Sequence, residues 1–211
     1  MAVAGSVSFV APVFACIIAS SPPERIVASE FTRIGAPALT ASGDYVYFTK
    51  LNADSRVQIR RQRLPNGQSE VFVPATAQEA SRPQLSPDGR WIAFLTSEAG
   101  STEVHVRSTD VEHSEDWRVA ACTSGRTALR WSHAGDELFY VANGVMMAVR
   151  VTTAGSFSFQ PPRPLFNLNG LLSASFDVGA DGRFLMVRPR PALRPRSELV
   201  MLERWTDLLR K

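Results

Sequence analysis

Five polar residues in three segments carry the side chains that a charged ligand requires: Arg82, Gln84, Arg130, Ser175 and Asp177. Polar and apolar residues alternate around each of them, as is typical of a β-strand with one exposed face. The guanidinium groups of Arg82 and Arg130 could pair with carboxylates, and the Asp177 carboxylate could accept a hydrogen bond from an amine. These five residues are the candidate site for a ligand or partner, and the chemistry they offer is binding.

The residue patterns of the common catalytic and metal sites are missing from the sequence. No Gly-x-Ser-x-Gly elbow is present, and no histidine follows His133, so a hydrolase triad of the usual chain order cannot be placed. His105 and His113 are isolated, and Cys16 and Cys122 have no partner at metal-ligand spacing. We therefore expect a protein that is not an enzyme, with no metal site and no cofactor.

The elements that must position the candidate residues follow from a repeat of 46 residues. Gly43, Gly89 and Gly135 lie 46 residues apart, and Gly182 follows after 47. Apolar residues keep step with these glycines on both sides. A period of this size with strand-type patterning predicts a β-propeller, in which each repeat forms one four-stranded sheet, or blade.

The second repeat shows how one blade is expected to form. A short strand ends at Ser86, Pro87-Asp88-Gly89 is a turn in which Asp88 bonds to its own backbone, and an apolar strand covers 90–96. Two further strands are expected at 103–107 and 117–120. The innermost strands of a propeller line its axial channel, so the candidate site is expected at the channel mouth.

We divide the chain into three parts. Residues 1–24 form an apolar segment, residues 25–205 form the blades and residues 206–211 form a tail. The repeats cover about 35–73, 81–120, 127–166 and 173–205. The helical spacing of Trp205, Leu208 and Leu209 predicts a short C-terminal helix. The expected fold is thus all-β, a propeller segment of about four four-stranded blades.

The closure of the ring is open to two interpretations. A loose strand at 25–28 could pair with the last repeat and close a four-bladed ring. Otherwise the blades form an arc with two exposed apolar faces, which is costly in water. We favour a fragment of a larger ring, or a ring that an oligomer or a partner chain completes.

The start of the chain and the overall charge leave the compartment open. No charged residue precedes Glu24, so residues 1–24 are interpreted as a blade remnant, a secretory signal or a weak membrane helix. The net charge is only +3, and basic residues lie among acidic ones, so nucleic acid is not an expected partner. Arginines gather at 56–63 and 188–196, where they predict either a solvated strand edge or a basic rim that meets an acidic partner.

Residues 81–94, SRPQLSPDGRWIAF, resemble the Pro-Asp-Gly repeat of TolB-like propellers. The other three repeats match this pattern less well. The last repeat also resembles the final blade of propellers found behind bacterial serine/threonine kinase domains, although Arg204 stands where that group has asparagine before the tryptophan. The resemblance implies protein interaction or ligand sensing, favours an extracytoplasmic location, and carries over no catalytic residue.

Three functions are therefore expected. The first is a non-catalytic module, a sensor or scaffold that binds a protein or peptide as part of a larger assembly. The second is the detached propeller of a prolyl-oligopeptidase-like hydrolase, which would gate a separate catalytic chain. The third is a periplasmic TolB-type accessory protein, which requires that the chain be exported.

Overall fold

The computed structural model describes residues 14–15, 24–25, 35–75, 78–112, 115–122, 127–171, 175–189 and 197–202. Within these ranges the chain is all-β, and its strands form four antiparallel sheets and one short pair. No helix of the described part is long and apolar enough to cross a membrane. The predicted helix at 206–211 and most of the segment at 1–24 lie outside the described residues.

Each of the four sheets corresponds to one predicted repeat. The first sheet contains β3 (Gly35–Leu39), β4 (Tyr45–Leu51), β5 (Val57–Arg63) and β6 (Ser69–Val73). The second contains β7 (Glu79–Leu85), β8 (Trp91–Glu98), β9 (Ser101–Ser108) and β10 (Asp116–Cys122). The third contains β11 (Leu129–Trp131), β12 (Glu137–Ala142), β13 (Val145–Thr152), β14 (Ser158–Phe159) and β15 (Arg163–Asn167). The fourth contains β16 (Phe176–Val178), β17 (Phe184–Pro189) and β18 (Ser197–Leu202).

The turn after the innermost strand is built by the residues that recur with the repeat. In the second sheet Gly89 has a φ of +71°, and its N–H donates to the Ser86 carbonyl at 2.9 Å. The Asp88 carboxylate accepts hydrogen bonds from the Ser86 hydroxyl and from the Arg90 N–H at 3.1 Å. The interpretation of Asp88 as a turn former is therefore confirmed.

The third repeat makes the same turn although its acid stands at a different place. The Ser132 hydroxyl donates to the Asp136 carboxylate at 2.7 Å and accepts from the Glu137 N–H at 3.0 Å. Gly135 has a φ of +75°, a conformation that glycine adopts without the steric cost of a Cβ. The acid follows the glycine in this repeat, yet it keeps the bond to the serine hydroxyl that Asp88 makes in the second repeat.

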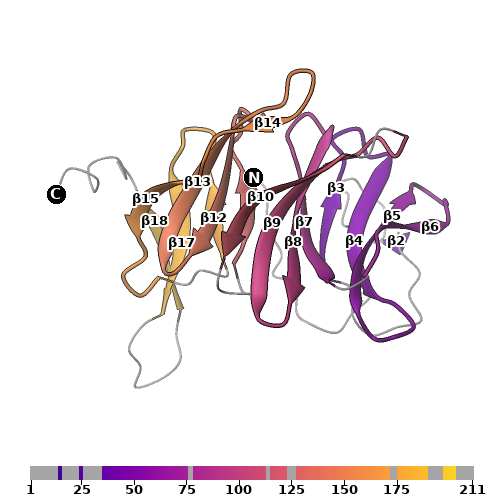
Figure 1. Cartoon of the computed structure of the whole chain (residues 1–211), viewed down its shortest axis with the longest axis horizontal. Helices are drawn as coiled ribbons and strands as arrows, with labels where there is room; N and C mark the ends of the chain where they lie inside the picture. Colours follow the sequence, from indigo (N-terminus) through magenta and orange to yellow (C-terminus); the bar gives the residue numbers. More distant parts are fainter. Residues whose placement is uncertain are drawn as a thin grey trace.

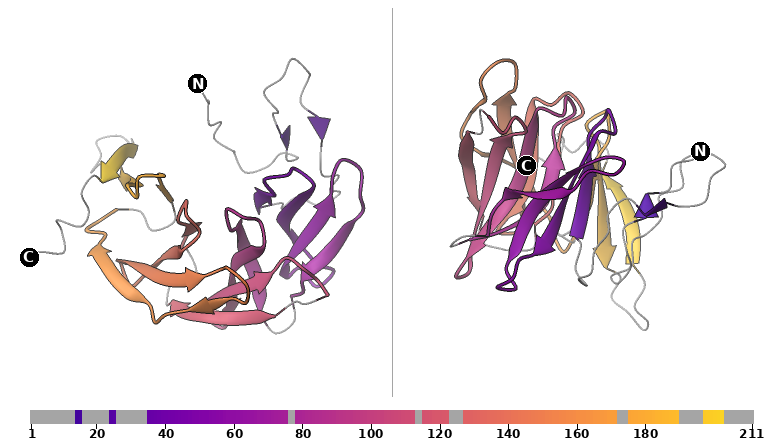
Figure 2. Two further views of the ribbon diagram at one scale, coloured as in Figure 1. Left: turned by 90° about the horizontal axis from the view of Figure 1, so that it is seen from above. Right: turned by 90° about the vertical axis from the view of Figure 1, so that its right-hand side faces the viewer.

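The sheets stack around a common centre, and apolar side chains fill each boundary. Figures 1 and 2 show the four sheets side by side along an arc, in chain order. The first and second sheets share a core that includes Tyr47, Ile59 and Phe94. Leu95 and Leu138 belong to the core between the second and third sheets, and a further core joins the third and fourth. This radial arrangement is that of a propeller, as predicted.

The arc is open between the first and fourth sheets in the described part of the chain (Figure 2). Two short strands, β1 (Phe14–Ala15) and β2 (Glu24–Arg25), form an antiparallel pair in which Phe14 lies opposite Arg25. Residues 26–28 lie outside the described residues, so closure through a strand at 25–28 stays a prediction.

A tryptophan on β11 ties the third sheet to the second. The Trp131 indole N–H donates to the Gln84 carbonyl on β7 at 3.0 Å, and its ring is almost fully buried. We expect Trp131→Phe to lower the free energy of unfolding by about 0.5–1.5 kcal/mol more than a matched control, because it leaves that carbonyl without its donor. The measurement is urea unfolding followed by circular dichroism.

The control is Trp117→Phe, since the Trp117 indole N–H makes no hydrogen bond within the described residues although its ring is also packed. Equal losses in the two variants would contradict a coupling of the sheets through the Trp131 bond.

Candidate functional site

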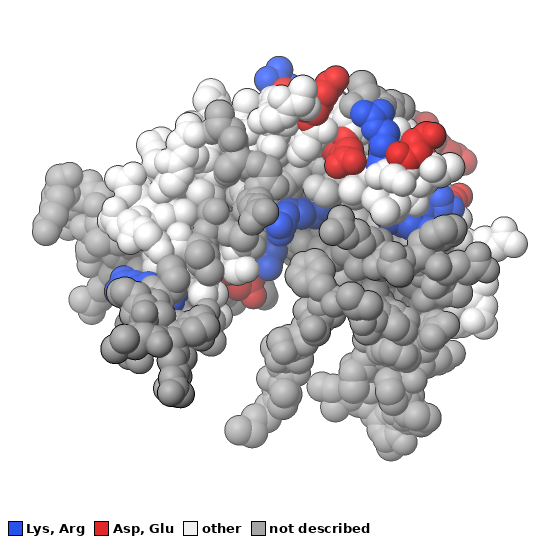
Figure 3. All heavy atoms as spheres, turned by 90° about the horizontal axis from the view of Figure 1, so that it is seen from below, with Lys and Arg blue, Asp and Glu red and all other residues white. Residues whose placement is uncertain are grey.

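The innermost strands β7, β11 and β16 bring three of the predicted residues to equivalent positions. Gln84 pairs with Ala93, Arg130 with Phe139 and Asp177 with Leu185. The three partners all lie on the second strand of their sheets. Because β11 contacts both β7 and β16, these positions follow one another along the inner side of the arc. Seen from below, Lys and Arg atoms lie in the hollow of the arc (Figure 3). We call the surface formed by Arg82, Gln84, Arg130, Ser175 and Asp177 the inner wall.

Arg82 and Ser175, the other two residues of the inner wall, stand two positions before Gln84 and Asp177 in the sequence. Ser175 is exposed, whereas Arg82 is half-buried. The pairing of β7 with β8 shifts between Ser81 and Gln84, which is a bulge, and Arg82 has a φ of +55° there. Bulges redirect side chains, and a positive φ is strained for an arginine, so the fold holds Arg82 in an unusual setting.

Two residues of the inner wall form an ion pair across neighbouring sheets. The Arg130 Nε–H donates to Asp177 Oδ1 at 3.2 Å, and an Nη1–H donates to the Leu129 carbonyl at 2.8 Å. The same Asp177 oxygen accepts the Val178 N–H at 3.0 Å. The Asp177 side chain is 69% exposed, so the pair contributes little to stability.

Arg82 makes no hydrogen bond and no ion pair within the ranges that the structure describes. Burial lowers the pKa of its guanidinium group, and the nearby charge of Arg130 lowers it further. The two arginines therefore repel one another, while the Asp177 carboxylate pairs with Arg130 alone.

An open hollow of about 330 Å³ adjoins the inner wall where β7 and β11 end. Its lining consists of Gln84, Leu85, Pro87, Arg130, Trp131, Ser132 and His133. The prediction placed Gln84 and Arg130 in the site but missed the turn residues. The repeat could have pointed to them. His133 lies 46 residues after Pro87, so both occupy the same position of the repeat, shortly after the inner strand.

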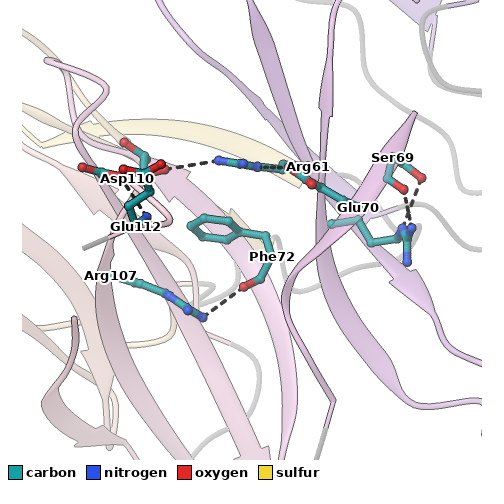
Figure 4. A network of polar contacts seen from close by, with 9 residues as sticks. Arg61, Ser69, Glu70, Phe72, Arg107, Asp110 and Glu112 are labelled. Carbon is teal, nitrogen blue, oxygen red and sulfur yellow. Dashed lines mark hydrogen bonds and ion pairs between the residues drawn. The ribbon is translucent and has the colours of Figure 1, made fainter. Parts of the chain in front are cut away.

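A second hollow of about 410 Å³ lies between the first and second sheets, and its lining includes Tyr45, Arg61 and Asp110. Figure 4 shows Arg61 and Arg107 on the two sides of the Phe72 ring, whose centroid lies 5.8 Å and 5.3 Å from their guanidinium carbons. Arg61 also pairs with Glu70 and donates to the Thr109 carbonyl at 3.3 Å.

The arginines at 56–63 were predicted to form either a solvated edge or a basic rim. Arg60 donates to the Ser69 carbonyl and side chain on β6, and Arg61 also bonds within the first sheet. These two arginines therefore hold strands together. The group at 188–196 lies mostly outside the described residues.

The His105 side chain on β9 is only 16% exposed. Its Nδ1 lies 2.7 Å from Asp116 Oδ1, and its Nε2 lies 3.3 Å from Glu103 Oε2. The ring also stacks on Phe94 at 5.6 Å between centroids. Among the described residues, no three His, Cys, Asp or Glu side chains are arranged so that they could hold a metal ion.

We expect the stability of the protein to depend on pH through His105. Burial works to lower the pKa of the imidazole, but the hydrogen bonds and charges of Asp116 and Glu103 outweigh it, so the pKa lies above its ordinary value. A raised folded pKa means that the charged ring stabilises the fold below the unfolded pKa of about 6.5 and that this contribution is lost as the pH rises through the folded pKa.

The measurement is the free energy of unfolding in urea across the neutral range for the wild type and for His105→Gln. The advantage of the wild type over the variant is expected to shrink with rising pH. Arg118, which pairs with Glu103 at 2.9 Å, is a further charged group at this cluster. A constant difference between the two proteins would contradict the prediction.

No protein-family model matches the chain, and no curated protein matches its sequence. Solved structures do match. TolB from Acinetobacter baumannii has a TM-score of 0.63 and 20% identity, over 86% of this chain and 43% of that one. Putative TolB from Agrobacterium tumefaciens has a TM-score of 0.61 and 13% identity, over 87% of this chain and 66% of that one.

The propeller domain of the Trilobed protease from Pyrococcus furiosus has a TM-score of 0.52 and 17% identity, over 81% of this chain and 54% of that one. The chain thus spans roughly half the length of the structures it matches. The resemblance to kinase-linked propellers is not confirmed by these matches and stays a prediction. At this level of identity the likeness establishes the fold, and the fold of this chain is that of a TolB-like β-propeller.

Proposed function

We propose that this chain is a non-catalytic propeller module that binds a protein or peptide partner at the inner wall. The observation that carries the proposal is the meeting of Arg82, Arg130 and Asp177 on the innermost strands of three successive sheets. Arg130 lines an open hollow there, and Asp177 of the next repeat pairs with it. Convergent polar groups at a concavity are the usual mark of a binding site.

The size and character of the surface favour a peptide segment. The inner wall spans three strands that lie side by side, and the adjoining hollow of about 330 Å³ combines charged Arg130 with the apolar side chains of Leu85 and Pro87. An extended peptide offers side chains to such pockets at alternate positions. Its backbone also supplies hydrogen-bonding groups for the polar side chains.

The same hollow contains a serine and a histidine, but their contacts speak against nucleophilic catalysis. The Ser132 hydroxyl donates to Asp136 at 2.7 Å and accepts the backbone N–H of Glu137, so it completes the turn. A catalytic serine would instead bond to a base such as His133. This supports a binding role.

The test is a selection of peptides from a random display library against the whole chain. Selected peptides are expected to compete with one another, and Ser175→Trp is expected to weaken them by about tenfold or more, because its bulky ring would fill part of the inner wall. Ser156→Trp is the matched control, since Ser156 is an exposed serine in the loop before β14. Failure to select any peptide, or equal binding to both variants, would count against the proposal.

A further inference from the structure

We infer that the inner wall anchors its partner through a carboxylate held between Arg82 and Arg130, an inference that rests on the proposed function. The anchor would be a peptide C-terminus or an acidic side chain, which share the same planar anion. Arg82 and Arg130 lie on the contacting inner strands β7 and β11, and the carboxylate of the inner wall, Asp177, pairs with Arg130.

Arg82 is the first reason for this assignment. Removing part of a guanidinium group from water is costly unless another group compensates for the lost hydration. Within the described residues Arg82 has no hydrogen-bond or ion-pair partner, and its neighbour Arg130 adds repulsion. Its backbone is held at a φ of +55° where the pairing of β7 with β8 shifts between Ser81 and Gln84. An incoming anion would offset both the lost hydration and the repulsion.

Asp177 is the second reason, because it already places a carboxylate against Arg130. The contact is a single Nε–H to Oδ1 bond of 3.2 Å, and that oxygen is shared with the Val178 N–H. Arginine can bind a carboxylate through two parallel bonds, which is a stronger arrangement. Asp177 is thus a weakly held internal carboxylate that a better-placed one can displace, and Arg82 supplies the second guanidinium group.

The probe is N-acetylglycine, which presents a terminal carboxylate, compared with N-acetylglycinamide, which lacks the charge. Titration of the whole chain at low salt is followed by the side-chain Nε–H resonances of its arginines. N-acetylglycine is expected to shift the Arg82 and Arg130 resonances saturably, whereas the amide is expected to leave them unchanged. Inorganic phosphate forms a third arm: if it binds far more tightly than N-acetylglycine, the site is a phosphate site and the inference is overturned.

Two variants give opposite expected results. Arg82→Gln is expected to weaken N-acetylglycine binding by about 10- to 100-fold, the range for loss of a hydrogen bond to a charged group. Asp177→Asn is expected to strengthen it several-fold, because the competing internal carboxylate is gone. Arg118→Gln is the matched control, since Arg118 also pairs with a carboxylate but lies on β10. Weaker binding in Asp177→Asn would overturn the inference, and this test stands even if Arg82→Gln does not fold.

The inference and the proposed function can fail separately. Peptides that bind at the inner wall equally well after C-terminal amidation and replacement of their acidic residues would refute the carboxylate anchor alone. Binding of N-acetylglycine with no selectable peptide would refute the peptide-binding function.

Discussion

Replacement of Phe94 by alanine is expected to lower the free energy of unfolding by about 3–5 kcal/mol, as is usual for a fully buried phenylalanine. Phe94 on β8 is 0% exposed and belongs to the core that joins the first and second sheets, together with Tyr47 and Ile59. Its loss would leave a cavity at a boundary between two blades, where neither sheet can close the gap without moving. Urea unfolding followed by circular dichroism measures the loss.

The matched control for this change is Phe159→Ala. Phe159 on β14 is 39% exposed, so its removal takes less apolar surface from the core and is expected to cost clearly less. If both variants lost the same stability, the boundary between the first two sheets would not be the buried core that the account requires.

Replacement of Phe184 by alanine is expected to release the fourth sheet before the others. Phe184 on β17 is 0% exposed, and its ring packs against Phe139 and Phe166 of the third sheet at 5.1 Å and 5.4 Å between centroids. In a repeat fold each unit is held by its neighbours, so a defect at an end boundary acts locally. A loss of about 3–5 kcal/mol would speed amide exchange in β16 and β17 by about two to four orders of magnitude.

The comparison strand for this experiment is β8, which lies in the second sheet. Hydrogen exchange of the folded protein is expected to show little change there, because the first three sheets keep their own shared cores. If amide exchange accelerated equally in β8 and β17, the sheets would unfold as one unit, and the expected local release of the fourth sheet would be contradicted.

Much of the fold could be predicted because the repeat appears in turn chemistry and strand patterning together. Gly43, Gly89, Gly135 and Gly182 all adopt positive φ, so their spacing marked the same turn in every sheet. Asp136 shows a limit of this method. The sequence pattern lacks the acid at the expected place, yet the carboxylate reaches the Ser132 hydroxyl from the other side of the glycine.

The sequence predicted which strands carry the candidate residues, but it did not predict which of these side chains touch one another. The alternation around Gln84, Arg130 and Asp177 placed them on inner strands, and the structure confirms that placement. The ion pair between Arg130 and Asp177 depends on the angle between neighbouring sheets, and the sequence pattern within one repeat does not determine that angle. The bulge at Arg82 could not be predicted either, because positive φ is contrary to the conformational preference of arginine.

The TolB-like fold does not choose between the three expected functions. The solved structures that match include both TolB and the propeller domain of the Trilobed protease, so the same scaffold occurs in different proteins. A role as a detached hydrolase propeller or as a periplasmic accessory protein therefore stays a prediction. The contacts of the inner wall are what favour the binding module.

Photo-crosslinking of a display-selected peptide to the whole chain tests most directly whether the inner wall is the binding surface. The peptide carries a benzophenone group, and the crosslinked residues are found by digestion and mass spectrometry. The account predicts crosslinks within residues 82–84, 128–131 and 175–178, on the three inner strands and the residues that lead into them. Crosslinks confined to the outer strands β6, β10 and β15 would contradict it.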